Sequence, residues 1–207
     1  MNSKQPKTRI QQKNISLILE AALDVFSQYG FRGSTLDHIA KTAGMSKPNL
    51  LYYFASKEAI HTTLLEGLME TWLDPLYKLN AEGNPRDEIL AYVHRKLQMS
   101  RDFPRESRLF ANEILQGAPR IGPAIEGELK SLVDEKSLVI DGWIAAGKIA
   151  PVDPRHLLFS IWSLTQHYAD FDVQVRMVLG EERPDPFPDA EAFLDTIFTR
   201  VLSPTQT

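Results

Sequence analysis

The 207-residue sequence contains no cysteine, so it holds no disulfide, no thiol nucleophile and no thiolate metal site. It has no run of about 18 apolar residues, which excludes a membrane-spanning helix. Its basic first residues are not followed by the apolar stretch of a secretory signal. Together these absences favour a cytoplasmic protein with no membrane partner.

Recognisable catalytic motifs are also missing. There is no G-x-S-x-G, H-E-x-x-H, Walker loop or dinucleotide-binding glycine motif, and the five histidines are not spaced as partners. In the stretch HYADFD, His167 and Asp170 could share a cation one helical turn apart, with Asp172 nearby. Such a cluster is more typical of a solvated or interfacial face. We therefore expect no enzyme, no cofactor and no metal site.

The formal net charge of −4 is distributed unevenly along the chain. Residues 1–57 carry eight Lys and Arg against three acids, whereas the remaining residues carry 15 against 24. The two segments therefore have net charges of +5 and −9. A basic head on an acidic body indicates one end for a polyanion and another end for a different role, unless the asymmetry is a chance feature of the surface.

Helical periodicity runs through the whole chain, and strand patterns are nearly absent. An apolar stripe over 18–29 predicts the first helix, which Gly30 can close. Ser34 or Thr35 can cap a second helix, and Ser34 could form a capping box with Asp37. The fold class is therefore all-α, with about nine helices. The later helical segments are expected near 86–101, 104–116, 123–146, 154–179 and 189–202.

Ala40 and Gly44 lie between two short helical patterns, and Ser46 can cap the second of them. A small residue where two helices touch, followed by a glycine for the tight turn, is typical of a helix-turn-helix. We interpret residues 1–58 as a DNA-binding domain and residues 59–207 as a ligand-binding and dimerisation body. Residues 1–13 form either a basic flexible arm along DNA or a solubilising tail, and their cations are Lys4, Lys7, Arg9 and Lys13.

The stretches ILEAALDVFSQYGFRGS and TLDHIAKTAGMSKPNLLYYFASKEAI strongly resemble the DNA-binding head of the TetR family of bacterial repressors. In the body, SRLFANEILQGAP, LVDEKSLVIDGWIAAGKIAPVDP and IWSLTQHYADF resemble a branch of that family that controls pyrimidine use, and the likeness fades from about Val173. The resemblance implies a homodimeric repressor that binds palindromic double-stranded operator DNA. It also implies release by a small-molecule effector, a pyrimidine base such as uracil or thymine.

By this resemblance, a recognition helix over 47–53 would lie in the major groove of DNA. Lys47 can donate to guanine and Asn49 can pair with adenine. The phenols of Tyr52 and Tyr53 could donate to phosphates, although one of these rings could instead lie in the core. Thr35 and Lys57 would contact phosphates near the starts of the second and fourth helices, and Pro48 would lie against the bases. The predicted DNA contacts are Thr35, Lys47, Pro48, Asn49, Tyr52, Tyr53 and Lys57.

In the body, Trp162 and Gln166 are spaced i, i+4 and share one helix face. A pyrimidine edge alternates N–H and C=O groups, so a Gln amide can pair with it while an indole stacks on the ring. Without the resemblance, a core Trp and a solvent-facing Gln would be the simpler interpretation. Trp72 lies on the helix that continues from the head and could close the pocket. The predicted effector contacts are Trp162, Gln166, Trp72, Phe110, Asn112 and Tyr168.

One recognition helix makes too few base contacts to select a genomic site, so two-fold pairing is expected. In the resembling family the last two helices form the dimer interface, and here they are expected at 154–179 and 189–202. The final segment offers an apolar face that a monomer would expose, made of Phe187, Phe193, Leu194, Ile197, Phe198 and Val201. Two alternatives remain, a TetR-like repressor that senses a more hydrophobic molecule and an architectural DNA-binding protein without a ligand.

Overall fold

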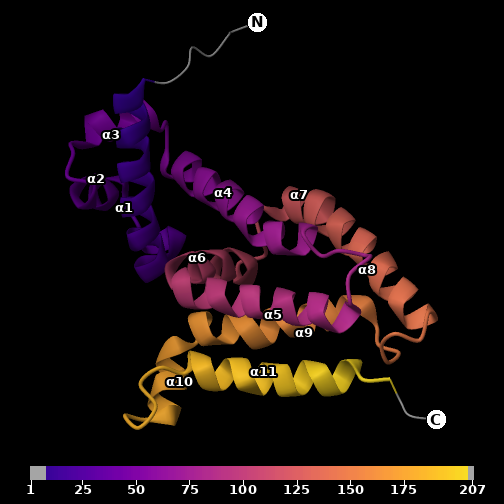
Figure 1. The fold of residues 1–207 in the computed structure, drawn as a ribbon. Helices are drawn as coiled ribbons and strands as arrows, with labels where there is room; N and C mark the ends of the chain where they lie inside the picture. The colour runs from indigo at the N-terminus through magenta and orange to yellow at the C-terminus, as the bar shows by residue number, and fades with distance from the viewer. Residues whose placement is uncertain (1–7, 205–207) are drawn as a thin grey trace, which may run out of the picture.

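A computed structural model describes residues 8–204, and within that range it contains helices and no strands (Figure 1). The head comprises α1 (Arg9–Gly33), α2 (Leu36–Thr42) and α3 (Lys47–Tyr53). The body begins with α4 (Lys57–Tyr77), α5 (Pro85–Asp102) and α6 (Pro104–Leu115). It continues through α7 (Gly122–Ala124), the π-helical turn η1 (Ile125–Leu129), α8 (Lys130–Ala145), α9 (Pro154–Asp170), α10 (Asp172–Leu179) and α11 (Phe187–Leu202). The predicted all-α class is confirmed.

The helix count differs slightly from the predicted nine. α7, η1 and α8 follow one another without a break, and counted as one they leave ten helices within residues 8–204. The additional helix arises because the segment predicted at 154–179 divides at Phe171, which ends α9 and precedes α10. None of the described helices is long and apolar enough to cross a membrane.

Local capping chemistry sets most helix starts, with two corrections to the sequence expectation. α1 begins at Arg9, where the Thr8 hydroxyl accepts from the Gln11 amide, so Arg9 and Lys13 lie on the helix rather than before it. Thr35 alone caps α2. Ser34 is buried and donates to the Gly30 carbonyl over 2.6 Å, so the capping box with Asp37 does not form.

Two hydrophobic cores run through the molecule. One lies between α5, α9 and α11, which are side by side in the lower part of the view, and includes Ile89, Leu158 and Phe198. The other joins the head to the body, because Phe26 of α1 and Leu50 of α3 belong to the same cluster as residues of α4, α5 and α6. α4 is one continuous helix that runs from the head into the body.

Candidate DNA interface and effector cavity

The turn between α2 and α3 has the geometry of a helix-turn-helix. Gly44 has a φ of +67°, which a residue with a Cβ adopts only with strain. The chain then reverses so tightly that the Met45 amide donates to the Ala40 carbonyl over 3.0 Å. Ala40 is buried where the two helices meet, and the Ser46 hydroxyl caps α3 by accepting from the Asn49 amide. The recognition helix therefore begins at the predicted residue.

The start of α3 is exposed. Lys47, Pro48 and Asn49 are all exposed to solvent. The Lys47 ammonium forms an ion pair of 2.9 Å with Asp37 of α2, and both side chains are largely accessible. Since exposed pairs of this kind contribute about 0–1 kcal/mol to stability, Lys47 remains available to exchange its partner for DNA.

Tyr52 and Tyr53 lie in different environments on α3. Tyr52 is 71% exposed, whereas Tyr53 is half-buried against the head core. The rings contact edge to face at 5.0 Å, and the Tyr53 oxygen accepts from the Asn14 amide of α1 over 2.7 Å. That bond leaves the Tyr53 hydroxyl proton free for an acceptor outside the protein.

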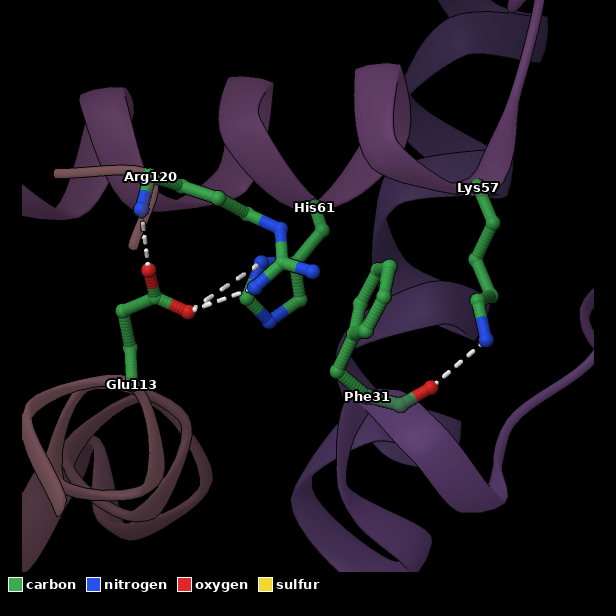
Figure 2. Close-up of polar contacts among 5 residues, drawn as sticks. All are labelled: Phe31, Lys57, His61, Glu113 and Arg120. Atoms are coloured by element: carbon green, nitrogen blue, oxygen red, sulfur yellow. Dashed lines mark hydrogen bonds and ion pairs between the residues drawn. The ribbon is translucent and has the colours of Figure 1, made fainter. Parts of the chain in front are cut away.

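Lys57 and Thr35 both have structural partners. The Lys57 ammonium donates to the carbonyls of Phe31 and Ser34 over 2.7 Å each, and it lies 4.2 Å from the centroid of the Phe31 ring (Figure 2). It therefore ties the start of α4 to the end of α1. Thr35 is exposed, and its hydroxyl accepts from the His38 amide. The predicted phosphate contacts of both residues stay predictions.

A cavity of about 80 Å³ lies in the body, between α4, α5, α6 and α9 and against η1. Four of the predicted effector contacts line it, namely Trp72, Phe110, Trp162 and Gln166. Two others lie outside its lining. Asn112 is half-buried elsewhere on α6, and Tyr168 packs against Phe187, with the ring centroids 6.0 Å apart. The remaining lining residues are Met69, Leu73, Leu76, Tyr92, Lys96 and Leu129.

The polar groups of the cavity come from α5 and α9. The Trp162 indole N–H donates to the Tyr92 hydroxyl oxygen over 2.7 Å, which holds the indole in place. Burial raises the pKa of Tyr92, so its phenol keeps its proton. Within residues 8–204 the Gln166 amide has no hydrogen-bond partner in the protein, so both its oxygen and its nitrogen can serve a ligand.

Sequence reasoning missed Tyr92 and Lys96, which are the other two polar residues of the lining. They are spaced i, i+4 on α5, as Trp162 and Gln166 are on α9. A lysine in an amphipathic helix is ordinarily placed at the solvent-facing side, and the sequence carries no signal that this one is only 3% exposed.

A buried charged cluster connects the head to the body (Figure 2). The Glu113 carboxylate of α6 accepts from the Arg120 backbone amide over 2.7 Å and from its guanidinium over 3.0 Å. That guanidinium stacks 3.6 Å from the centroid of the Phe31 ring in the head. The Nδ1 atom of His61 on α4 lies 4.0 Å from Glu113 and has no hydrogen-bond partner among the described residues. One link from α6 to the head therefore runs through the Arg120 guanidinium and the Phe31 ring.

Burial and neighbouring cations act on the imidazole of this cluster. His61 is 2% exposed and contacts the Phe26 and Phe31 rings edge to face. Burial, with the Arg120 charge second, lowers the pKa of His61 to about 4. The imidazole is therefore neutral at physiological pH. At the other end of α6, Arg105 forms ion pairs with Glu20 and Asp24 of α1.

The three residues of the HYADFD stretch do not converge. Asp170 accepts from the Ser107 hydroxyl over 2.6 Å, and burial raises the pKa of its carboxyl. Asp172 pairs with Arg176 over 2.7 Å, and the His167 ring stacks on Phe171. Across the described part of the chain, no three His, Cys, Asp or Glu side chains gather as metal ligands would.

A helix-turn-helix head linked by α4 and α6 to a body with a cavity defines a DNA-binding regulator with a sensor domain. Family comparison agrees with this class. Residues 18–62 match the model described as "Bacterial regulatory proteins, tetR family", and residues 65–205 match "YcdC-like protein, C-terminal region". The chain belongs to the TetR family. It is a ligand-responsive transcriptional regulator and not an enzyme.

Individual relatives are consistent with this assignment. The chain is 52% identical over 163 residues to the HTH-type transcriptional regulator RutR of Escherichia coli K12, covering 79% of this chain and 77% of RutR. It is 30% identical over 158 residues to the regulator YhgD of Bacillus subtilis, covering 72% and 78%.

Solved structures share the fold at low sequence identity. A regulatory protein of the tetR family from Rhodococcus RHA1 superposes with a TM-score of 0.76 at 19% identity, over 94% of this chain and 99% of that one. AibR in complex with isovaleryl coenzyme A and operator DNA superposes with a TM-score of 0.69 at 18% identity, over 92% and 99%.

Proposed function

We propose that this regulator represses genes of pyrimidine catabolism and leaves its palindromic operator when a pyrimidine base such as uracil or thymine binds in the body. The observation that carries the proposal is the free Gln166 amide in a small cavity walled by Trp72, Phe110 and Trp162. A flat ring can stack on such walls while its edge pairs with the amide. The similarity to RutR supports the same assignment.

On DNA, we propose that residues 1–58 form the binding domain and that the exposed start of α3 enters the major groove. Lys47 and Asn49 are then at base edges and Pro48 lies against the bases, while Tyr52 and Tyr53 contact phosphates. Thr35 adds a contact at the start of α2. Lys57 holds the head in shape through two carbonyls, and the third N–H of its ammonium contacts a phosphate.

For dimerisation we propose that α9 and α11 of two copies pack together within the 59–207 body. Phe159 of α9 and Phe193 and Val201 of α11 are 47%, 55% and 43% exposed, which is unusual for apolar side chains of their size. The apolar face predicted for α11 is smaller than expected. Leu194 and Phe198 are each 1% exposed and belong to the core of their own chain, as does Phe187.

A second candidate is an effector more hydrophobic than a pyrimidine. It is favoured by the aliphatic part of the cavity lining, which Met69, Leu73, Leu76 and Leu129 provide. The cavity of about 80 Å³ argues against it, because pockets for drug-sized ligands span roughly 300–1,000 Å³.

The deciding experiment measures effector-induced release from DNA. An operator fragment, selected by the protein from random inverted repeats, is titrated with uracil, thymine, cytosine and a lipophilic cation, and bound DNA is followed by fluorescence anisotropy. We expect uracil or thymine to release it and the cation to leave it bound. Release by the cation alone would establish the second candidate, and binding that no small molecule alters would indicate an architectural protein.

A further inference from the structure

Lys96 places a buried ammonium group in the cavity wall. The side chain lies on α5, one turn after Tyr92, and the residue is 3% exposed. Its Nζ atom is 5.3 Å from the centroid of the Trp72 ring on α4. Among the described residues it is the only charged group that lines the cavity. A cation at this depth is costly to the fold unless something compensates it.

The protein compensates this charge only in part, through the Trp72 ring. Within residues 8–204 the Lys96 ammonium has no hydrogen-bond or ion-pair partner, and Asp170 acts on it only through a longer-range attraction. Lys136 of α8 is a useful contrast, since it is also buried at 7% exposure. Its ammonium pairs with Glu135 over 2.9 Å and donates to the Leu79 carbonyl over 3.4 Å. Lys136, the other buried lysine of the described residues, is therefore paired within the protein, whereas Lys96 is not.

The donors of the cavity outnumber its acceptors. Lys96 offers N–H groups, and the Tyr92 hydroxyl still has a proton to donate because its oxygen already accepts from Trp162. The Gln166 amide oxygen is the one side-chain acceptor without a partner in the lining. A ligand that fits this set carries more carbonyl oxygens than N–H groups along its polar edge, and it carries no positive charge.

We propose that Lys96 anchors the effector by donating to a ring carbonyl, while Gln166 pairs with the adjacent N–H and C=O, so that the cavity accepts neutral or anionic carbonyl-bearing rings and rejects cations. This inference rests on the proposed pyrimidine response and names a residue that determines its specificity. The cavity is small enough for one ring to reach both side chains, because α5 and α9 face each other across it. The ring carbonyl of the ligand then accepts the hydrogen bond for which Lys96 has no acceptor in the described residues.

The first test is the affinity for uracil, measured by calorimetry with wild type and Lys96→Met. Losing a charge-assisted hydrogen bond should weaken binding about tenfold to a hundredfold. Lys96→Gln, which keeps a neutral donor, should lie between the two. Lys136→Met is the matched control, a buried lysine off the cavity, and it should bind uracil like wild type. Circular dichroism of each variant establishes that it is folded.

The ligand atom is identified with 2-thiouracil and 4-thiouracil, in which sulfur replaces one carbonyl oxygen and accepts more weakly. Wild type should lose affinity for the analogue whose altered position meets Lys96. Lys96→Met should no longer distinguish that analogue from uracil. A general loss of fit would instead penalise the analogues equally in both proteins, and that outcome would contradict the anchor.

A second readout follows proton uptake on binding. Burial lowers the pKa of Lys96 to about 7, so at pH 8 most of the free protein carries the neutral amine. A carbonyl oxygen against the nitrogen favours the ammonium form, and wild type should therefore take up part of a proton with uracil. Titrations in buffers of different ionisation enthalpy measure this uptake, and Lys96→Met should abolish it.

The two proposals fail differently. If wild type binds uracil and Lys96→Met binds it equally well with the same proton uptake, the anchor is wrong and the pyrimidine function stands. If wild type neither binds nor responds to any pyrimidine, the proposed function is wrong and the anchor falls with it.

Discussion

The head and the body hold their candidate contacts in opposite environments. The predicted DNA contacts come from one stretch of chain, Thr35 to Lys57, and most of them are exposed. The cavity draws its lining from α4, α5, α6, η1 and α9, across residues 69 to 166, and its polar residues Tyr92 and Lys96 are buried while Gln166 is half-buried. A surface site assembled by neighbouring helices can be recognised from local spacing. A buried site assembled by distant helices depends on how they pack.

Lys57 and Lys96 show the same difference between the head region and the body. Lys57 in the head region has two carbonyl partners and an aromatic ring beneath it, so its charge is compensated by the protein. Lys96 in the body is more deeply buried and lies over the Trp72 ring, but its ammonium has no hydrogen-bond or ion-pair partner among the described residues. A buried charge with partners in the protein is tolerated by the fold. A buried charge without them lowers the stability of the ligand-free protein, and a ligand that pairs with it gains affinity.

Between the two regions, α4 and α6 provide the physical connection. Trp72 of α4 and Phe110 of α6 line the cavity, while Lys57 and His61 of α4 and Glu113 of α6 meet the Phe31 region of the head. Release requires that the effector bind one arrangement of the heads more tightly than the other. A ring that moves either helix acts on both regions at once.

The largest expected effect is on the pH dependence of folding stability, and it arises from His61, which lies where α4 and α6 meet the head. The pKa of His61 is about 4 in the folded protein and 6.5 for the free side chain, so the unfolded chain binds more protons between these values. Stability therefore falls as pH drops from 6.5 to 4, by about 3 kcal/mol in total. Urea unfolding at stepped pH should show a smaller loss for His61→Phe. The exposed His156→Gln should follow wild type, and equal slopes in all three would exclude His61 as the cause.

The next effect is on effector response in the body. Gln166→Leu keeps helix propensity and approximate volume but removes both amide groups, so ring N–H and C=O groups lose their partners. The cost is about 1–3 kcal/mol, or roughly tenfold to more than a hundredfold in affinity. The variant should remain a repressor that uracil no longer releases. Release curves beside wild type and the exposed control Gln116→Leu decide it, and identical midpoints remove Gln166 from the site.

A third prediction concerns Lys96 and the pH dependence of the stability of the ligand-free protein. Since the folded pKa of Lys96 is about 7 and the free side chain titrates near 10.5, the unfolded chain holds more protons above pH 7. Stability should therefore rise between pH 7 and 9, by about 2 kcal/mol. Thermal unfolding should show this rise in wild type and a flatter profile in Lys96→Met. Parallel profiles would mean that Lys96 is compensated after all.

The smallest effect distinguishes Lys57 from Lys47, which are both among the predicted DNA contacts. Lys57→Met keeps the apolar stem but removes the ammonium from two carbonyls, and it should destabilise the protein by about 1 kcal/mol. Lys47→Met breaks only an exposed pair and should cost less than about 0.5 kcal/mol, yet weaken operator binding. Urea unfolding and gel shifts compare them. If Lys57→Met weakened operator binding without changing stability, Lys57 would be a direct DNA contact.

Several elements of this protein follow from its sequence alone. The spacing of Ala40, Gly44 and Ser46 determined the helix-turn-helix and the first residue of the recognition helix, because caps and tight turns depend on neighbours within a few residues. The i, i+4 spacing of Trp162 and Gln166 put both on one face of a helix, and both line the cavity, although the spacing without the family resemblance favoured a core Trp and a solvent-facing Gln.

Only the tertiary structure decided which side chains lose their solvent. It buried Lys96 without a partner, gave Lys57 two carbonyls, and joined Glu113 to Arg120 over the Phe31 ring. It also enclosed Leu194 and Phe198 in their own chain's core. The physical reason is the separation along the chain over which each effect acts. Helix periodicity and capping act over one or two turns, whereas desolvation is set by the helices that meet around a residue, and these come from distant parts of the chain.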